Sequence, residues 1–136
     1  MKLLLDANAV IFLLNNDVRL GQQARDAIMD SSNAVYISSL TMFELAVKIR
    51  IGKLAINLTE AIAMIDETAI QRIEIEDTHC IAMSKLVSMA GHKDPYDLML
   101  IAQGIVEGMT IVTSDGRFAS YPVNVMSCED LAVPIS

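Results

Sequence analysis

The sequence predicts an α/β fold in which a central, mainly parallel β-sheet lies between layers of helices. Short segments rich in Leu, Ile and Val alternate along the chain with longer segments of helical character. Several of the short segments are apolar throughout, as expected for strands that helices cover on both faces. The 136 residues contain no repeat and no Pro/Gly/Ser-rich linker, so we expect a single domain over residues 1–136.

The first half of the chain predicts two strands and four helices. Residues 2–5 form a short apolar strand that ends at Asp6, and residues 34–38 alternate in polarity and include Val, Tyr and Ile. Gly52 is the stop signal of the third helix. The expected helices cover residues 8–14, 21–30, 41–51 and 59–69.

The second half predicts three strands and two helices. Pro95 stands at the first position of the most apolar helix, directly after Asp94, and Gly108 ends that helix. The segment 109–113 is β-branched, which favours a strand. The expected strands cover residues 72–75, 109–113 and 123–126, and the expected helices cover residues 77–89 and 95–106.

The composition limits the class of protein. Hydrophobic residues make up 53% of the chain, yet no apolar run approaches the roughly 18–20 residues of a membrane span. Asp6 and Asn8 interrupt the apolar start of the chain, which argues against an export signal, so we expect a cytoplasmic protein. Cys80 and Cys128 fit no zinc spacing and are expected to be reduced and buried.

The charge restricts how the protein can meet nucleic acid. Lys and Arg number 10 and Asp and Glu number 17, which gives a net charge of −7. A protein that binds nucleic acid by electrostatic attraction alone should be basic. This objection weakens if several carboxylates share a bound cation, because the metal reverses the local charge.

Acidic residues stand where the predicted strands end and the helices begin. Asp6 follows the first strand, and Glu44 lies in the first turn of the helix after the second strand. Asp115 follows the 109–113 strand, and Asp94 and Asp97 open the helix before it. Because the carboxyl ends of parallel strands share one edge, we expect all these acids at that edge, where ligands bind.

Most of these acids also have a structural explanation. Asp6 is a possible cap for the next helix, and residues 41–44 (TMFE) match a capping box. Asp94 before a proline is a good N-cap, and we favour that role over metal ligation. Residues 115–116 (DG) are an ordinary turn signal. The individual positions therefore leave both readings open.

Asp97 fits a structural role least well, because it shares a helical face with Ile101 and Gly104 in an apolar helix.

Carboxylates held close together repel one another unless a cation joins them. Oxygen ligands without Cys or His at metal spacing favour Mg²⁺ or Mn²⁺ over zinc. His79 lies in a helical pattern and His92 in a loop, and no Ser-His-Asp set or Gly-rich phosphate loop competes.

Taken in order, four stretches resemble the motifs of PIN-domain ribonucleases. They are residues 3–8 (LLLDAN), 38–46 (SSLTMFELA), 97–104 (DLMLIAQG) and 111–115 (IVTSD). Two further stretches resemble the VapC-like toxin branch of type II toxin–antitoxin systems. They are residues 46–54 (AVKIRIGKL) and 92–97 (HKDPYD).

This resemblance implies a PIN-like three-layer fold, endoribonuclease activity with Mg²⁺ or Mn²⁺, a cognate antitoxin that blocks the site, and a homodimer. Carried over residue by residue, it implies that the metal-binding, catalytic acids are Asp6, Glu44, Asp97 and Asp115. Asn8 and Thr113 match small polar positions that orient ligands or waters, and Asp94 is either a cap or an outer acid. The basic candidates for holding RNA are Lys48, Arg50, Lys53, Lys93 and Arg117.

Two other functions remain open at this point. Haloacid-dehalogenase-like phosphatases place an Asp after the first strand but need a second Asp where this chain has Asn8, and receiver domains need a paired early acid that it lacks. The other alternative is a catalytically silent PIN-fold module that binds an antitoxin or RNA. The net charge of −7 favours such a module, and the full set of acids argues against it.

Overall fold

The central sheet of the protein is parallel and has helices on both faces. The computed structural model describes residues 1–89 and 91–130. In this part of the chain the sheet has five strands in the order β3-β2-β1-β4-β5, and all four strand pairings are parallel. The predicted fold class is therefore confirmed. The strands are β1 (Lys2–Leu5), β2 (Ala34–Ser38), β3 (Gln71–Ile73), β4 (Thr110–Thr113) and β5 (Val125–Ser127).

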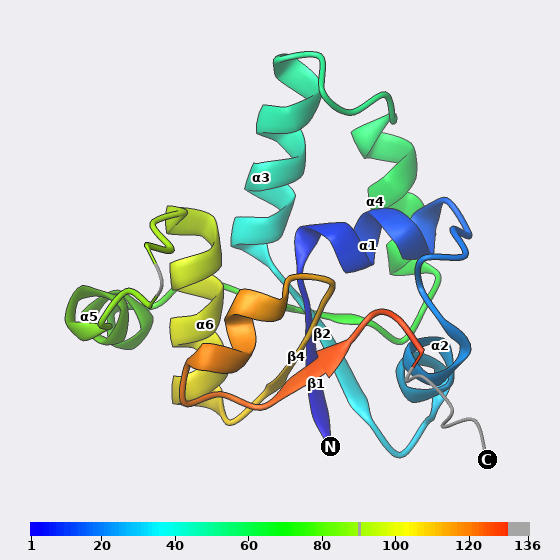
Figure 1. The fold of residues 1–136 in the computed structure, drawn as a ribbon. Helices are drawn as coiled ribbons and strands as arrows, with labels where there is room; N and C mark the ends of the chain where they lie inside the picture. Colours follow the sequence, from blue (N-terminus) through cyan, green and yellow to red (C-terminus); the bar gives the residue numbers. More distant parts are fainter. Residues whose placement is uncertain (90, 131–136) are drawn as a thin grey trace.

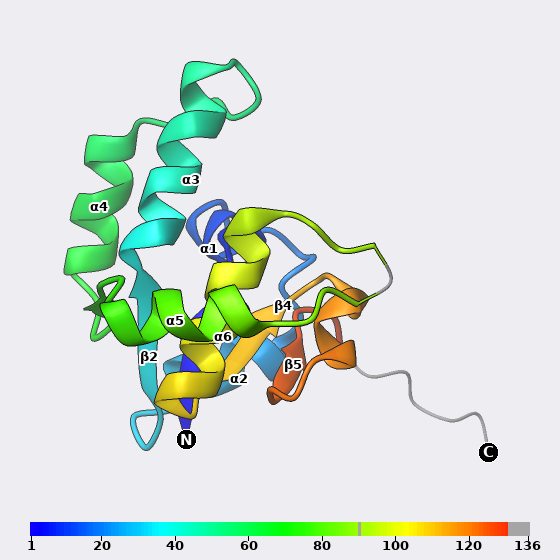
Figure 2. The ribbon, with the colours of Figure 1, turned by 90° about the vertical axis from the view of Figure 1, so that its left-hand side faces the viewer.

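The helices form two outer layers. In Figure 1, α5 and α6 lie on one side of the sheet and α1 and α2 on the other. Helices α3 and α4 run side by side beyond the carboxyl edge of the strands (Figures 1 and 2). The helices are α1 (Ala7–Leu14), α2 (Gln22–Met29), α3 (Ser39–Arg50), α4 (Leu58–Asp66), α5 (Asp77–Lys85) and α6 (Pro95–Glu107), and a 3₁₀ helix, η1 (Gly116–Ser120), follows β4.

Strand β1 separates two hydrophobic cores. Leu3 and Leu5 pack into the core beneath α1 to α4, whereas Leu4 packs into the core beneath α6. All three side chains are fully buried, and each contributes about 1.5–3 kcal/mol to folding. The apolar run from Leu3 to Leu5 follows from the central place of this strand in the sheet.

The topology fixes where a ligand can bind. Strand β1 pairs with β2 on one side and with β4 on the other, so the order of strands reverses at β1. In open parallel sheets such a reversal leaves a crevice beyond the carboxyl ends of the strands. Here the end of β1 and the starts of α3 and α6 meet at that edge (Figure 1).

Two helices are shorter than the sequence predicts. The predicted helix 59–69 ends at Asp66, because the Thr68 hydroxyl donates to the Ile65 carbonyl at 2.6 Å and begins a turn. The predicted helix 77–89 ends at Lys85, and Leu86 is extended and packs against the α6 core. Beyond it, the Met89 N–H donates to the Tyr121 hydroxyl at 3.1 Å instead of continuing the helix.

Two strands are shifted from their predicted positions by the register of their neighbours. Strand β3 stops at Ile73, because Ile73 pairs with Ser38, the last residue of β2. Strand β5 begins at Val125, which pairs with Ile111 of β4. A partner strand sets these limits, and local polarity does not reveal it.

The prediction of two buried cysteines is wrong for one of them. Cys80 is exposed on α5, whereas Cys128 is buried in the first core. Burial raises the pKa of the Cys128 thiol to about 12, so this thiol is protonated at neutral pH. Among the described helices, none is long and apolar enough to cross a membrane.

Candidate metal centre

Asp6 is the most buried acid at the carboxyl edge, with 6% of its surface exposed. It follows β1 directly, and one carboxylate oxygen accepts the Ala9 N–H at 2.8 Å, so Asp6 also caps α1. Its own N–H donates to the Val112 carbonyl at 3.1 Å and ties it to β4. Burial raises the pKa of Asp6 to about 6, although interactions with Thr113 and Ala9 oppose the shift.

Glu44 extends from α3 into the pocket that Asp6 lines. Burial raises the pKa of Glu44, and Lys48, whose Nζ lies 3.2 Å from Glu44 Oε2, partly opposes this. The predicted capping box at residues 41–44 is wrong, because α3 begins at Ser39 and the Ser38 hydroxyl caps it by accepting the Leu40 N–H. The position of Glu44 therefore has no capping explanation.

Asp97 and Asp94 have different roles at the start of α6. Asp94 is exposed and accepts the N–H groups of Tyr96 and Asp97 at 2.9 and 3.4 Å, which confirms its predicted role as N-cap. Asp97 lines the pocket instead. Burial raises the pKa of Asp97, while a hydrogen bond with His92 opposes the shift.

Asp115 lies at the end of β4 and is engaged by Arg117. It accepts the Arg117 backbone N–H at 2.9 Å, as the predicted turn requires, and the Arg117 guanidinium contacts both its oxygens, the shortest contact being 2.7 Å. This contact lowers the pKa of Asp115. The same guanidinium lies 4.0 Å from Asp97, so it links the two acids.

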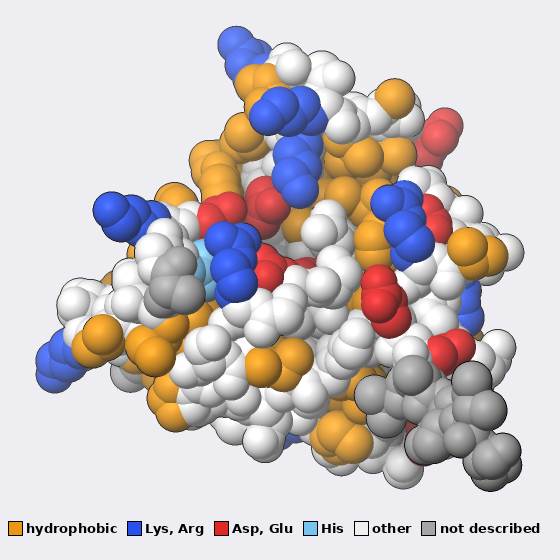
Figure 3. All heavy atoms as spheres, viewed as in Figure 1, with side chains coloured by type: hydrophobic (Ala, Val, Ile, Leu, Met, Phe, Trp, Pro, Cys, Tyr) orange, Lys and Arg blue, Asp and Glu red, His pale blue; other side chains and the backbone are white. Residues whose placement is uncertain are grey.

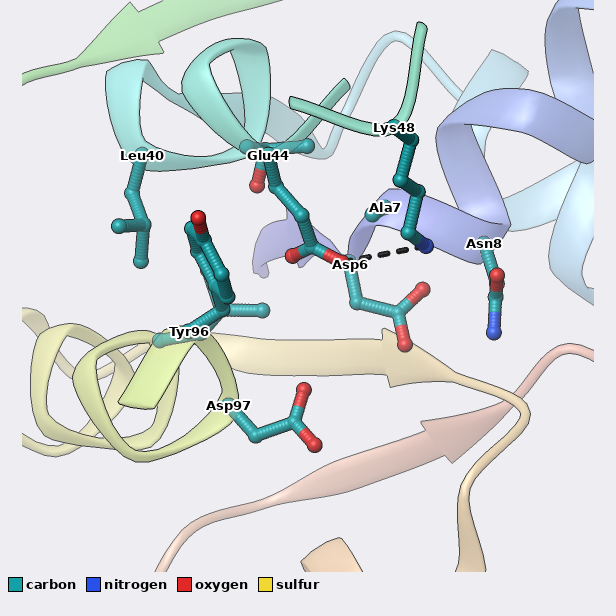
Figure 4. A pocket seen from close by; sticks show the side chains of 10 residues that line it. Asp6, Ala7, Asn8, Leu40, Glu44, Lys48, Tyr96 and Asp97 are labelled. Atoms are coloured by element: carbon teal, nitrogen blue, oxygen red, sulfur yellow. Dashed lines mark ion pairs between the residues drawn. The ribbon is translucent and has the colours of Figure 1, made fainter. Parts of the chain in front are cut away.

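Three of the four predicted metal ligands line one pocket. Asp6, Glu44 and Asp97 extend into it from the end of β1, from α3 and from α6 (Figure 4). The pocket offers about 30 Å³, more than the roughly 10–15 Å³ that one water requires. Asn8 also lines it. Figure 3 shows Asp and Glu side chains at a hollow that Lys and Arg side chains border.

Asp115, the fourth predicted ligand, lies close to Asp97 and His92. Ligand atoms of His92, Asp97 and Asp115 lie within 4.8 Å of one another. Among the described residues, no set of three or more such ligands that includes Asp6 or Glu44 is as closely spaced. Thr113 connects the two parts of the site. Its hydroxyl accepts the Asp115 N–H at 3.0 Å and also interacts with Asp6.

The donor chemistry of the pocket suits a hard divalent cation. Its acids offer only carboxylate oxygens, the ligands that Mg²⁺ and Mn²⁺ prefer. Desolvation raises the pKa values of Asp6, Glu44 and Asp97 even though Lys48 lies beside Glu44 and Arg117 near Asp97, so a further positive charge in the pocket would stabilise the ionised acids. The residues present therefore fit such an ion.

Two features of the site are absent from the sequence prediction. His92 is fully buried and contacts Asp97, although its loop position gave no reason to expect this. The sequence suggests only an RNA-binding role for Arg117, yet Arg117 pairs with Asp115. The second pairing has a local signal, because the same Asp-x-Arg arrangement at Asp17 and Arg19 forms the same bidentate contact elsewhere.

We expect the Arg117→Gln variant to bind Mn²⁺ more tightly than the wild-type protein. Arg117 competes with a cation for Asp115, and an exposed ion pair of about 0.2–1 kcal/mol corresponds to a gain of up to about fivefold. Titration followed by electron paramagnetic resonance measures the affinity. Arg19→Gln is the matched control and leaves it unchanged. Equal or weaker binding by Arg117→Gln would show that Arg117 does not compete.

These features together define a three-layer α/β domain with a carboxylate pocket at the edge where its parallel strands end. The PIN-domain family profile matches residues 3–124. The chain belongs to the PIN-domain family. None of the curated proteins compared with the chain matches it.

Several solved structures share this fold. VapBC2 from Rickettsia felis, bound to a DNA fragment from its promoter, is 17% identical, with a TM-score of 0.70 over 93% of this chain and 98% of that chain. DNA-bound VapBC from Salmonella typhimurium is 20% identical, with a TM-score of 0.69 over 94% and 98%. VapBC-1 from nontypeable Haemophilus influenzae is 17% identical, with a TM-score of 0.67 over 94% and 98%. At these identities the likeness shows the fold.

Proposed function

We propose that this protein is a metal-dependent endoribonuclease and the toxin of a type II toxin–antitoxin pair. The observation that carries the proposal is the convergence of Asp6, Glu44 and Asp97 on one pocket from three separate elements. Family membership supports it, because PIN domains are generally nucleases and typically use divalent metal ions. We also propose that residues 1–136 form a single PIN domain that acts in the cytoplasm.

In this proposal Asp6, Glu44, Asp97 and Asp115 hold Mg²⁺ or Mn²⁺. A bound ion of this kind supplies the charge that polarises a phosphodiester and lowers the pKa of a water. The four carboxylates position that charge, and their partial burial strengthens their attraction for it. Thr113 holds Asp6 and Asp115 relative to each other through its hydroxyl.

The surroundings of the pocket support an RNA substrate. Lys48 and Arg117 pair with site acids, whereas no ion pair within the described residues includes Arg50, Lys53 or Lys93. In the proposal these three exposed side chains are available for phosphates. Figure 3 shows Lys and Arg side chains over α3, beside the acidic hollow. Basic side chains beside the pocket offset the net charge of −7 at the place where RNA would bind.

We further propose two protein partners, a cognate antitoxin that blocks the pocket and a second copy of the chain in a homodimer. The fold neighbours that support an antitoxin are VapBC structures, two of which contain DNA. The sequence resemblance to VapC-like toxins, carried by residues 46–54 and 92–97, supports both partners.

The test is cleavage of a mixed cellular RNA pool by the purified protein with Mg²⁺, with Mn²⁺ and with EDTA. We expect fragments with either metal, none with EDTA, and none from Asp97→Asn, which keeps the side-chain shape but removes the charge. No cleavage by the folded, antitoxin-free protein with either metal would contradict the nuclease proposal. That outcome would favour a PIN-fold module that binds an antitoxin or RNA without cleaving it.

A further inference from the structure

We propose that His92 is a positioning residue that orients the carboxylate of Asp97 for metal binding. This inference rests on the proposed function, because it takes Asp97 as a metal ligand. His92 lies between α5 and α6, and its side chain is fully buried. Its Nε2 lies 2.8 Å from Asp97 Oδ2. A wholly buried ring therefore contacts a carboxylate that lines the pocket.

The Tyr121 hydroxyl contacts the nitrogen of the His92 ring that faces away from Asp97. The Met89 N–H donates to the Tyr121 hydroxyl oxygen at 3.1 Å, and this hydroxyl lies 3.2 Å from His92 Nδ1. Since the oxygen already accepts a hydrogen bond, the hydroxyl hydrogen is available to Nδ1. With that hydrogen directed at Nδ1, the ring nitrogen that faces Asp97, Nε2, is the one that donates to the carboxylate.

The aromatic side chains after Asp115 hold the His92 ring in place. Its centroid lies 5.8 Å from that of Phe118 and 5.6 Å from that of Tyr121, with tilted and edge-on geometries. Both aromatic side chains are buried. The segment that carries Asp115 therefore also fixes the ring that contacts Asp97, which places two candidate ligands in one packed unit.

Orientation of Asp97 is a better assignment for His92 than direct metal ligation. Both ring nitrogens are engaged, Nδ1 with Tyr121 and Nε2 with Asp97. Without this contact, the partly buried side chain of Asp97 on the first turn of α6 could adopt other staggered rotamers. Loss of an outer hydrogen bond of this kind typically weakens metal binding about 10–100-fold.

The test measures Mn²⁺ affinity by electron paramagnetic resonance in His92→Ala, His92→Gln and Tyr121→Phe, with RNA cleavage and urea unfolding alongside. The Gln amide can replace the Nε2 donor. The matched control is His79→Gln. His79 is also fully buried, and its Nε2 lies 2.8 Å from Glu107, but it belongs to the α5–α6 contact outside the pocket.

We expect His92→Ala to lose about 10–100-fold in Mn²⁺ affinity, His92→Gln to recover most of it, and His79→Gln to bind like the wild type. Tyr121→Phe should weaken Mn²⁺ binding by a smaller factor. If His92→Ala does not fold, the Mn²⁺ affinity of Tyr121→Phe decides the question instead. Unchanged affinity in the folded His92 or Tyr121 variants, no recovery in His92→Gln, or an equal loss in His79→Gln would overturn the inference. Failure of the wild-type protein to bind Mn²⁺ would instead contradict the proposed function.

Discussion

We expect Asp6→Asn to lose RNA cleavage while it stabilises the metal-free protein at neutral pH. The cleavage rate should fall more than about 100-fold, beyond the 10–100-fold typical of residues that only support a metal ligand. The gain in stability follows from burial, which raises the pKa of Asp6 from 3.8 to about 6. Asn can still accept the Ala9 N–H that caps α1, so the fold retains that contact.

The pH dependence of this stabilisation has a defined sign. Above pH 4 the carboxyl group ionises in the unfolded chain, but in the folded protein it stays protonated until about pH 6. The wild type therefore loses stability as the pH rises between these values, by about 2–3 kcal/mol at most, and Asp6→Asn does not. Below pH 4 the difference disappears.

Urea unfolding in EDTA at pH 4 and pH 7.5 measures this difference in the free energy of unfolding. Asp17→Asn is a control of opposite sign, because Arg19 lowers the pKa of Asp17 to about 2 and removal of its charge should lower stability at neutral pH. If Asp6→Asn were no more stable than the wild type at pH 7.5, the buried charge of Asp6 would not lower the free energy of unfolding.

We expect Mn²⁺ to stabilise the wild-type protein and to have little effect on Glu44→Gln. A ligand that binds only the folded state adds about 2.7 kcal/mol to the free energy of unfolding at 100 times its Kd. Glu44 lines the pocket beside Asp6 and Asp97, so its neutral analogue removes one anionic ligand and weakens binding. Urea unfolding with Mn²⁺ and with EDTA measures the difference.

A second cluster provides the control for this measurement. Ligand atoms of Glu76, His79 and Glu107 also lie within 4.8 Å of one another, away from the pocket. Glu107→Gln should therefore retain the full stabilisation by Mn²⁺. If Glu107→Gln lost it and Glu44→Gln kept it, the metal would bind at this second cluster instead.

The meeting of the acids could be predicted from the sequence because it depends on topology. Asp6 follows an apolar strand, and Asp97 opens an apolar helix. Once the sheet is parallel, strand ends and helix starts share one edge. The same topology predicts Glu44 at this edge, although the local sequence pattern suggests a cap. The structure puts that cap at Ser38, three residues before Thr41.

The rest of the site depends on contacts between distant residues. Tyr121 lies 32 residues beyond Met89 and 29 beyond His92, yet it contacts both. These contacts explain why the chain leaves α5 early and why His92 is buried, and no local pattern encodes either. By contrast, the Arg117–Asp115 contact is local, and its Asp-x-Arg spacing could have been recognised from Asp17 and Arg19.

Anomalous diffraction from crystals grown with Mn²⁺ locates the metal in the folded protein. We expect a peak within ligand distance of Asp6 and Asp97, in the pocket that Glu44 also lines, and its loss in Asp6→Asn. A peak only at Glu76, His79 and Glu107, or none at saturating Mn²⁺, would contradict the assignment of this pocket as the metal centre.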